Sequence, residues 1–564
     1  PFAEMIVHYD KLRKVSGIEG ALYNAEGIKI KTLKKSEVKD YSNTSEANLA
    51  DDDRVKYHSF GQTTYPYTVE YETTVEYDGL FNLPDWIPVL NENIAIQNSS
   101  FKVVASADYL LRYKAYNYKA EPVVTEVKKM KEYSWSLSNF AAIKDEPYKP
   151  SWHEITPAVF IAPSSFEMQR YPGNMNTWKE FGEFMYRLNA GRDQLPQHIK
   201  QKVHQLTDGI SDPKKKVEVL YKFLQQNTRY ISIQLGIGGW QTLDAGFVAT
   251  NGYGDCKALS NYMTALLKEA SIPAYPALIR AGRNEDDIID DFSSNQFNHV
   301  IVCVPLEKDS IWLECTSQTT PAGYMGSFTG NRQALLVSES GSTLVNTPVY
   351  KPADNLQNRT IKGTISEDGA LAADVINYYS GMQQDRLDNM LKQSSNVQFS
   401  EYMRTKFDLP SYELVEFNHT SKPGILPSIE ERLKLKVIHY GSITGKRLFI
   451  NPNILSVSSF KIKDAANRKY DFEIKTGFID TDSVEIQIPA GYKPESVPSA
   501  LNISTAFSKY RSEVLIQPGK IIYVRRYEQQ AGRIPAAKTK EVADFFEKIY
   551  RSDHSRIVFI KEAP

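Results

Sequence analysis

The chain has 564 residues, 41% of them hydrophobic and 24% charged, with a formal net charge of −1. One hydrophobic core does not support this length, so several domains are expected. The near-neutral charge gives no electrostatic reason to expect nucleic acid as a partner, and no apolar run reaches the ~18–20 residues of a transmembrane helix. Three cysteines without a CxxC pair exclude a disulfide framework, and we expect neither a metal site nor a cofactor.

Residues 1–165 carry the pattern of β-strands. Within 67–77, Val69, Tyr71 and Val75 alternate with polar residues, and this period of two indicates a half-buried antiparallel strand. Similar runs, "FKVVAS" and "YLLRYKAY", follow between turn-forming residues. The spacing predicts an N-terminal β-sandwich domain.

The periodicity changes to that of helices near residue 175. The segment "TWKEFGEFMYRLN" places its apolar side chains at helical spacing, and Asp212 with Pro213 gives an N-cap and a first helical residue for a second helix. A third helix begins at Cys256, and strand-like segments follow at 299–306 and 310–316. Helices followed by a sheet predict an α+β domain, which we place at 170–350.

Strand patterns return over 355–564, which we expect to form a C-terminal β-rich domain, a second sandwich. The segment "NLQN" at 355–358, preceded by "YKPADN", is expected to be a linker. Hairpins are predicted around Asp368-Gly369 and Pro518-Gly519. A final helix is expected at 539–550. The predicted fold is therefore multidomain, with a sandwich on each side of the α+β domain.

A cysteine opens the third predicted helix, in "NGYGDCKALS". At about 100° per residue, Cys256 lies at the edge of the apolar stripe that contains Leu259 and Met263, whereas Lys257 and Asn261 face away. Free backbone N–H groups and the helix dipole favour a thiolate in the first turn. The same position also suits a small buried residue, so position alone fits either a nucleophile or core packing.

A histidine and a glutamate in the following strands could complete a reactive set. If 299–306 and 310–316 pair as a hairpin, Glu314 lies directly across from His299 on the same face. A carboxylate there can hold the imidazole in one tautomer and stabilise its charged form, the general logic of a nucleophile, a base and an orienting group. Cys303 shares that face and Cys315 points to the other, so both are expected to fill the core without a disulfide.

The sequence contains no complete motif for the other reaction classes that we considered. "HEITP" lacks the second histidine of a zinc-protease helix, "GSFTG" has its serine out of place for a nucleophile elbow, and "GIGGW" lacks the lysine of a phosphate loop. The acidic run "NEDDIIDD" fits a solvated loop.

The segments "NGYGDCKALS", "FNHVIV" and "IWLECTSQTTPAG" resemble the cysteine, histidine and acidic segments of the bacterial transglutaminase-like superfamily. The stretch 229–256 is similar to the version in large bacterial proteins whose papain-like domain lies between two β-sandwiches. The resemblance implies Cys256 as nucleophile and His299 as general base and then acid, with Glu314 where the family usually has aspartate. It also implies an oxyanion hole made by the Cys256 N–H and one further donor, for which Trp240 and Gln241 are candidates.

Cysteine–histidine pairs of this superfamily attack an amide, form a thioester and pass the acyl group to water or to an amine. The resemblance therefore implies a peptidase, an amidase or a transglutaminase-like acyltransferase that acts on a peptide or protein amide. It further implies a periplasmic or cell-surface location in a bacterium, although no signal segment is visible. The oligomeric state stays open.

The alternative is a catalytically inactive binding or scaffold protein that recognises peptide or glycan through its sandwiches. The intact Cys256, His299 and Glu314 set favours the enzyme, whereas the glutamate at position 314 favours the alternative.

Overall fold

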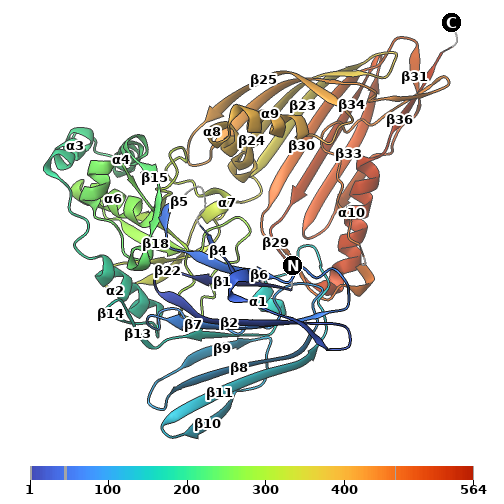
Figure 1. Cartoon of the computed structure of the whole chain (residues 1–564). Coiled ribbons are helices and arrows are strands. Elements are labelled where there is room, and N and C mark those ends of the chain that lie inside the picture. Colours follow the sequence, from blue (N-terminus) through green and yellow to red (C-terminus); the bar gives the residue numbers. More distant parts are fainter. Residues whose placement is uncertain (1–2, 44–47, 464, 563–564) are drawn as a thin grey trace.

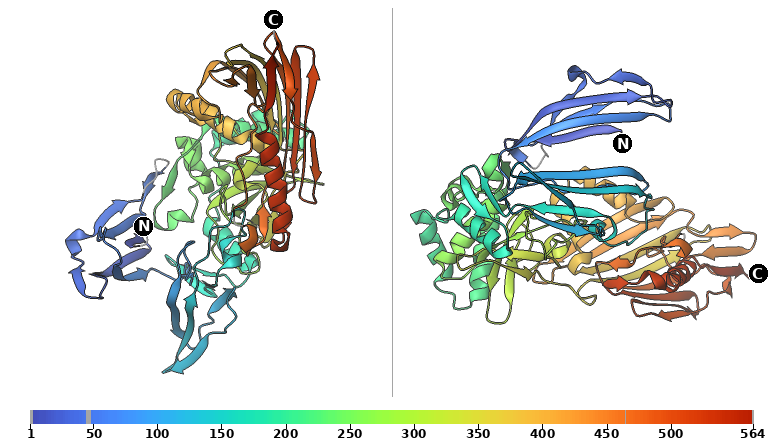
Figure 2. Two further views of the ribbon diagram at one scale, coloured as in Figure 1. Left: turned by 90° about the vertical axis from the view of Figure 1, so that its right-hand side faces the viewer. Right: turned by 90° about the horizontal axis from the view of Figure 1, so that it is seen from below.

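The chain forms a multidomain, strongly β-rich molecule in which three parts follow one another along the sequence (Figure 1). The computed structural model describes residues 3–43, 48–463 and 465–562. Two further views show the N-terminal strands, the helical central part and the large C-terminal sheet as separate bodies in contact (Figure 2). Within these described residues, no helix combines the length and apolarity needed to cross a bilayer.

The N-terminal part consists of small sheets. Its strands are β1 (Glu4–Tyr9), β2 (Arg13–Tyr23), β3 (Lys29–Thr32), β4 (Lys39–Ser42), β5 (Asn48–Asp51), β6 (Arg54–Ser59), β7 (Thr68–Tyr77), β8 (Ile96–Ser106), β9 (Arg112–Tyr116), β10 (Val123–Val127), β11 (Met130–Phe140) and β12 (Ala158–Ala162). They pair in the orders β1-β6-β4, β3-β2-β7, β10-β11-β8 and β12-β9. The alternating segment 67–77 forms β7 as predicted, and Trp86, Trp135 and Val159 pack together in a core.

The central part combines helices with one five-stranded antiparallel sheet. After α1 (Trp152–Ile155), β13 (Ser165–Met168) and β14 (Tyr171–Asn174), its helices are α2 (Trp178–Asn189), α3 (Gln197–Thr207), α4 (Pro213–Asn227), α5 (Ala245–Asn251), α6 (Cys256–Glu269) and α7 (Gly326–Thr329). Its strands are β15 (Arg229–Tyr230), β16 (Ser232–Gln234), β17 (Tyr253–Gly254), β18 (Tyr275–Ile279), β19 (His299–Pro305), β20 (Ser310–Leu313), β21 (Gln333–Leu336) and β22 (Thr343–Asn346). The sheet has the order β20-β19-β18-β21-β22.

The predicted helix starts of the central part are confirmed. The Asp212 side chain accepts a hydrogen bond from the Lys214 N–H, and Pro213 is the first residue of α4. The apolar stripe of α6 packs on the sheet, where Leu259 and Met263 share one core with Val302 of β19. This packing places the start of α6 beside the start of β19.

The C-terminal part is dominated by an eight-stranded sheet of the order β25-β26-β24-β23-β30-β34-β33-β32 and a four-stranded sheet of the order β27-β28-β36-β31. The strands are β23 (Leu356–Ile365), β24 (Leu371–Ser380), β25 (Tyr412–Lys422), β26 (Ser428–Val437), β27 (Ser442–Thr444), β28 (Arg447–Ile450), β29 (Phe472–Ile474), β30 (Phe478–Gln487), β31 (Tyr492–Ser496), β32 (Leu501–Ser504), β33 (Ser508–Gln517), β34 (Lys520–Gln529), β35 (Gly532–Ile534) and β36 (Ile557–Lys561). The helices are α8 (Asp385–Gln393), α9 (Asn396–Thr405) and α10 (Thr539–Asp553).

Apolar residues of both C-terminal sheets meet in one core, where Ile361 and Val375 pack with Leu448 and Phe559. Both predicted hairpins are confirmed, as β23–β24 and β33–β34.

The expected linker at 355–358 is wrong. Asn355 is fully buried and donates a side-chain hydrogen bond of 2.9 Å to the Gly477 carbonyl, and Leu356 already begins β23. The polar residues of "NLQN" obscured the strand because alternation between buried and exposed side chains begins only after them.

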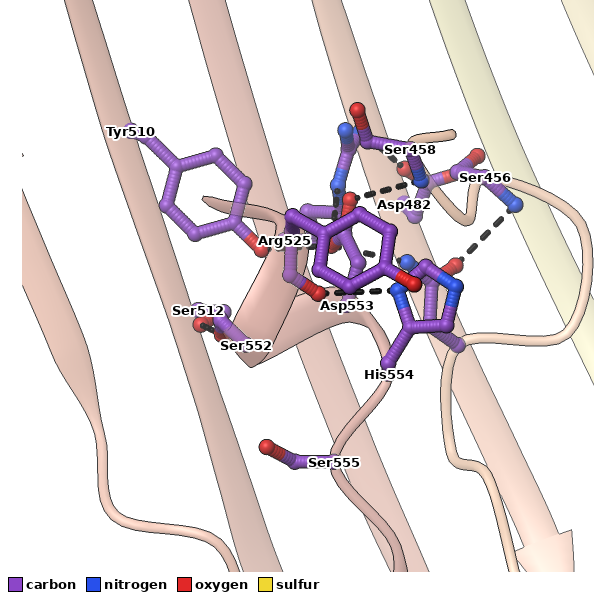
Figure 3. Close-up of polar contacts among 12 residues, drawn as sticks. Ser456, Ser458, Asp482, Tyr510, Ser512, Arg525, Ser552, Asp553, His554 and Ser555 are labelled. Carbon is purple, nitrogen blue, oxygen red and sulfur yellow. Dashed lines mark hydrogen bonds and ion pairs between the residues drawn. The ribbon is translucent and has the colours of Figure 1, made fainter. Parts of the chain in front are cut away.

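A buried ion network ties α10 to the eight-stranded sheet (Figure 3). The Arg525 guanidinium lies 3.1 Å from the Asp482 carboxylate and 3.2 Å from that of Asp553, the last residue of α10. Asp553 also accepts hydrogen bonds from the Tyr510 hydroxyl, at 2.6 Å, and the Asn453 side-chain amide, at 2.9 Å. Every side chain in the group is buried, so the network can persist only because each charge has partners.

Candidate active site

Cys256 is held at the first residue of α6 by the segment that precedes it. Asp255 is the N-cap and accepts a 2.9 Å hydrogen bond from the Ala258 N–H. Gly254 pairs with Tyr230 in the short parallel ladder of β15 and β17, and a Cβ on this glycine would lie only 2.7 Å from the Ala258 Cβ. The thiol therefore starts the helix in the predicted place and is 6% exposed.

Lys257 is buried, although we expected its side chain to face away from the apolar stripe of α6. The side chain is 9% exposed, and its Nζ lies 2.5 Å from the Asp255 carboxylate. Burial acts to lower the pKa of Lys257, yet the charges of Asp255 and Cys256 and the hydrogen bond to Asp255 together outweigh it, and the pKa is raised. Helical periodicity missed this because the loop after α2 covers that face, where the Asn261 amide donates to the Arg192 carbonyl at 2.8 Å.

His299 and Glu314 form a buried pair. The His299 Nε2 lies 3.1 and 3.0 Å from the two carboxylate oxygens, and the two side chains are 9% and 8% exposed. Burial opposes the charged imidazole, but the Glu314 charge and a hydrogen bond with Cys256 raise the pKa of His299 to about 10. Burial likewise opposes the carboxylate, but His299 and Thr316 keep the pKa of Glu314 lowered. The structure thus brings the three predicted side chains together, with the Glu314 carboxylate on Nε2 of His299.

The hairpin register differs from the expected one by two residues. Val302 pairs with Leu313 rather than with Ile311, and Glu314 lies just past the end of β20. Glu314 stays on the His299 face because side chains alternate with a period of two, but it lies diagonally rather than directly opposite. Diagonal neighbours are farther apart than direct ones, so the extra methylene of glutamate helps the carboxylate reach the imidazole.

Two residues that sequence reasoning missed fix Glu314. The Thr316 hydroxyl and N–H donate to its carboxylate at 2.6 and 3.2 Å, and the Tyr221 hydroxyl of α4 donates to its backbone carbonyl at 2.7 Å. Gln225 of α4 holds the loop that follows by donating to two of its carbonyls. A threonine two residues after an acidic residue is a local signal that could have indicated Thr316. Nothing in the sequence pointed to Tyr221.

The two candidate oxyanion donors differ in the structure. The N–H groups of Trp240 and Gln241 both donate to the Ile237 carbonyl, and the Gln241 side-chain amide donates to the Leu188 carbonyl at 2.9 Å. Gln241 is therefore committed elsewhere in this conformation. The Trp240 indole N–H makes no hydrogen bond within the described part of the chain, and its ring packs on the apolar cluster that contains Cys256. Trp240 therefore stays a candidate for the second oxyanion donor, and the structure does not support Gln241 in that role.

The N-terminal part contacts the segment that carries Trp240. Strand β5 pairs with β16 in parallel, the Asp52 carboxylate accepts a 3.1 Å hydrogen bond from the Gly236 N–H, and the Phe81 ring centroid lies 4.8 Å from that of Trp240. In Figure 1, β5 lies beside β15 at the edge of the central part. This contact joins the N-terminal part to the surroundings of the thiol.

The other two cysteines are confirmed as free and buried. Cys303 packs with Trp312 on one face of the sheet, and Cys315 packs with the α6 core on the other. Burial raises the pKa of both thiols, well above the ordinary value for Cys315. Among the described residues, no group of three or more His, Cys, Asp or Glu side chains is arranged to hold a metal ion.

Two domains of unknown function that have solved structures match the ends of the chain, DUF3857 over residues 1–144 and DUF3858 over residues 446–559. No curated protein matches. The crystal structure of a candidate protease from Parabacteroides distasonis ATCC 8503 has a TM-score of 0.60 at 14% identity, covering 99% of this chain and 92% of that one. This likeness shows a shared fold across nearly the whole chain.

A candidate cysteine protease from Cytophaga hutchinsonii gives a TM-score of 0.20 at 9% identity, covering 61% of this chain and 86% of that one. At that score the comparison carries no argument.

Proposed function

We propose that the protein is a thiol-dependent hydrolase or acyltransferase, transglutaminase-like in its chemistry, that acts on a peptide or protein amide, with hydrolysis favoured. The observation that carries the proposal is the buried His299–Glu314 pair at 3.0 Å, in which the side chain of Cys256, the residue that opens α6, also helps to raise the pKa of His299. The fold shared with a candidate protease supports it.

In the proposed reaction, the Cys256 thiolate attacks the amide carbonyl, and the carbonyl π electrons move onto oxygen. The N–H of Cys256, in the first turn of α6, and the Trp240 indole N–H stabilise that oxyanion. The His299 imidazolium then gives its proton to the departing amine as the C–N bond breaks, which leaves a thioester. Neutral His299 next takes a proton from water, the resulting hydroxide attacks the thioester, and the acid and the thiolate are released.

Glu314 remains a carboxylate throughout the proposed cycle. Its charge stabilises the imidazolium, and its hydrogen bond to Nε2 fixes the ring so that Nδ1 faces the sulfur. Thr316 and Tyr221 keep this carboxylate in place and do not touch the reacting atoms.

A binding or scaffold protein is the second candidate, and one observation favours it. Cys256, His299 and Glu314 are each less than one-tenth exposed, so the thiol is closed to solvent in this conformation. A scaffold that has lost turnover could keep such a closed set, and an enzyme must open it.

Mass spectrometry of denatured protein substrates incubated with the wild type and with Cys256→Ala separates the candidates. The proposal predicts new peptide termini with the wild type only; an added primary amine that appears on the product instead would indicate transfer. Unchanged substrates under both conditions, with the thiol intact, would leave only the scaffold.

A further inference from the structure

We infer that a cavity of about 430 Å³, lined by Trp240 and by Lys257, the residue that follows Cys256, is a specificity pocket that takes a large, uncharged, apolar side chain from the acyl part of the substrate. The inference rests on the proposed function and names the class of substrate for that site. It does not depend on whether water or an amine accepts the acyl group.

The lining of the cavity links it to the apolar cluster that contains the thiol. Four of its walls, Met185, Leu278, Val300 and Val337, belong to the same apolar cluster as Cys256. Trp240, the remaining oxyanion candidate, packs on that cluster and lines the cavity as well, and so does Lys257, which follows the thiol in the chain. From these shared residues we place one side chain of a substrate bound to the thiol in this cavity.

The polar groups of the inner wall already have partners. Lys257 is paired with Asp255, and the Asn261 amide donates to two backbone carbonyls. The Thr242 N–H donates to the Asn189 side-chain carbonyl at 2.7 Å. A charged side chain that entered would lose hydration without gaining a free counter-charge, which is costly. An apolar side chain would bury its surface against the four apolar walls, which is favourable.

The outer end of the cavity is different. Lys268 and Asp193 form an exposed ion pair there, at 2.6 Å, and Glu339 also lines this end. Charges in water at the mouth keep the entrance hydrated and contribute little to binding. The inner walls therefore determine which substrate side chain the cavity binds. The volume lies within the ~300–1,000 Å³ typical of ligand pockets, so an aromatic or long aliphatic side chain fits better than a methyl group.

The test uses peptidyl chloromethyl ketones that differ only in the side chain next to the reactive group: Phe, Leu, Ala, Lys or Asp. The rate of Cys256 alkylation by each probe is divided by the rate with iodoacetamide, which has no side chain to place. We expect the Phe and Leu probes to exceed the Lys and Asp probes by at least ~10-fold, as apolar pockets discriminate by ~10–200-fold. Equal ratios, or a preference for Lys or Asp, would overturn the inference.

Two variants place the effect at the cavity. Val337→Trp fills it and should reduce the Phe preference by about 10-fold, and Val337→Ala enlarges it and should favour Phe further over Leu. The matched control is Val349→Trp, which places the same side chain on the surface, because Val349 is 63% exposed. Preferences that persist in both Val337 variants would overturn the inference, whereas failure of iodoacetamide to select Cys256 in the wild type would count against the proposed function instead.

Discussion

Two groups of charged side chains in this molecule are buried to a similar degree, but we expect only one of them to react with a substrate. In the C-terminal part, Arg525 is shared by Asp482 and Asp553, and donors from several elements occupy these carboxylates (Figure 3). In the central part, His299 and Glu314 are paired just as closely, but the imidazole also interacts with the Cys256 sulfur, which has no hydrogen bond to another residue in the described part of the chain. Burial and charge alone therefore do not identify an active site. What distinguishes the proposed active site is a reactive sulfur next to the imidazole, together with the cavity that we propose binds a substrate side chain.

The largest expected effect is a loss of turnover, which only the group around Cys256 should show. Cys256→Ala should reduce amide turnover by at least ~1,000-fold, because removal of a nucleophile leaves only binding and oxyanion stabilisation. Turnover of a peptide that the wild type cleaves is the measurement. Cys303→Ala is the matched control and should retain activity, since its thiol lies buried against Trp312.

The second effect concerns stability rather than turnover. Asp553→Ala leaves Arg525 buried without one of its partners and should lower the free energy of unfolding by about 3–5 kcal/mol. Urea denaturation followed by far-UV circular dichroism, which reports the strands of the C-terminal part, measures this change; the six tryptophans lie outside that part. Cys256→Ala, measured alongside, should cost much less. A loss of comparable size in the two variants would show that both groups are structural.

The carboxylate charge of Glu314 should determine the pH at which kcat/KM falls. As pH rises through the His299 pKa of about 10, the imidazolium loses the proton that the leaving amine needs, so kcat/KM should fall only at strongly alkaline pH. Glu314→Gln removes the carboxylate charge that raises this pKa, so the alkaline fall should move to lower pH, and turnover should drop by ~10–100-fold. The pH dependence of kcat/KM from pH 6 to 11 tests this.

Glu314→Asp keeps the charge but shortens the side chain across a diagonal pair, and we expect an intermediate loss. An alkaline fall at the same pH in all three proteins would remove Glu314 from the mechanism.

These sites also show how far sequence reasoning reaches. The helix start at Cys256, its N-cap and the shared face of His299 and Glu314 follow from periodicities of 3.6 and 2, which are local. The register and the burial of Lys257 do not, because they depend on which elements from distant sequence cover a strand end or a helix face. Gln241 is a candidate donor in the sequence, but in the structure its side-chain amide donates to the Leu188 carbonyl at the end of α2.

The smallest expected effect tests the hydrogen bond between Asp52 of the N-terminal part and Gly236 of the central part. Asp52→Asn weakens the hydrogen bond to the Gly236 N–H, and a bond worth ~0.5–1.5 kcal/mol should translate into a few-fold faster alkylation of Cys256 as the segment loosens. Asp40→Asn is the control, because Asp40 pairs with Lys56 and Tyr9 inside the N-terminal part. Equal acceleration in both variants would indicate general destabilisation of that part.

Competitive alkylation of the three cysteines with iodoacetamide at neutral pH, read by peptide mass spectrometry in the wild type and in His299→Ala, tests the central claim most directly. The account predicts that Cys256 reacts faster than Cys303 and Cys315, and that loss of the imidazole slows Cys256 alone. Labelling of Cys256 no faster than the other two, or unchanged by His299→Ala, would contradict it.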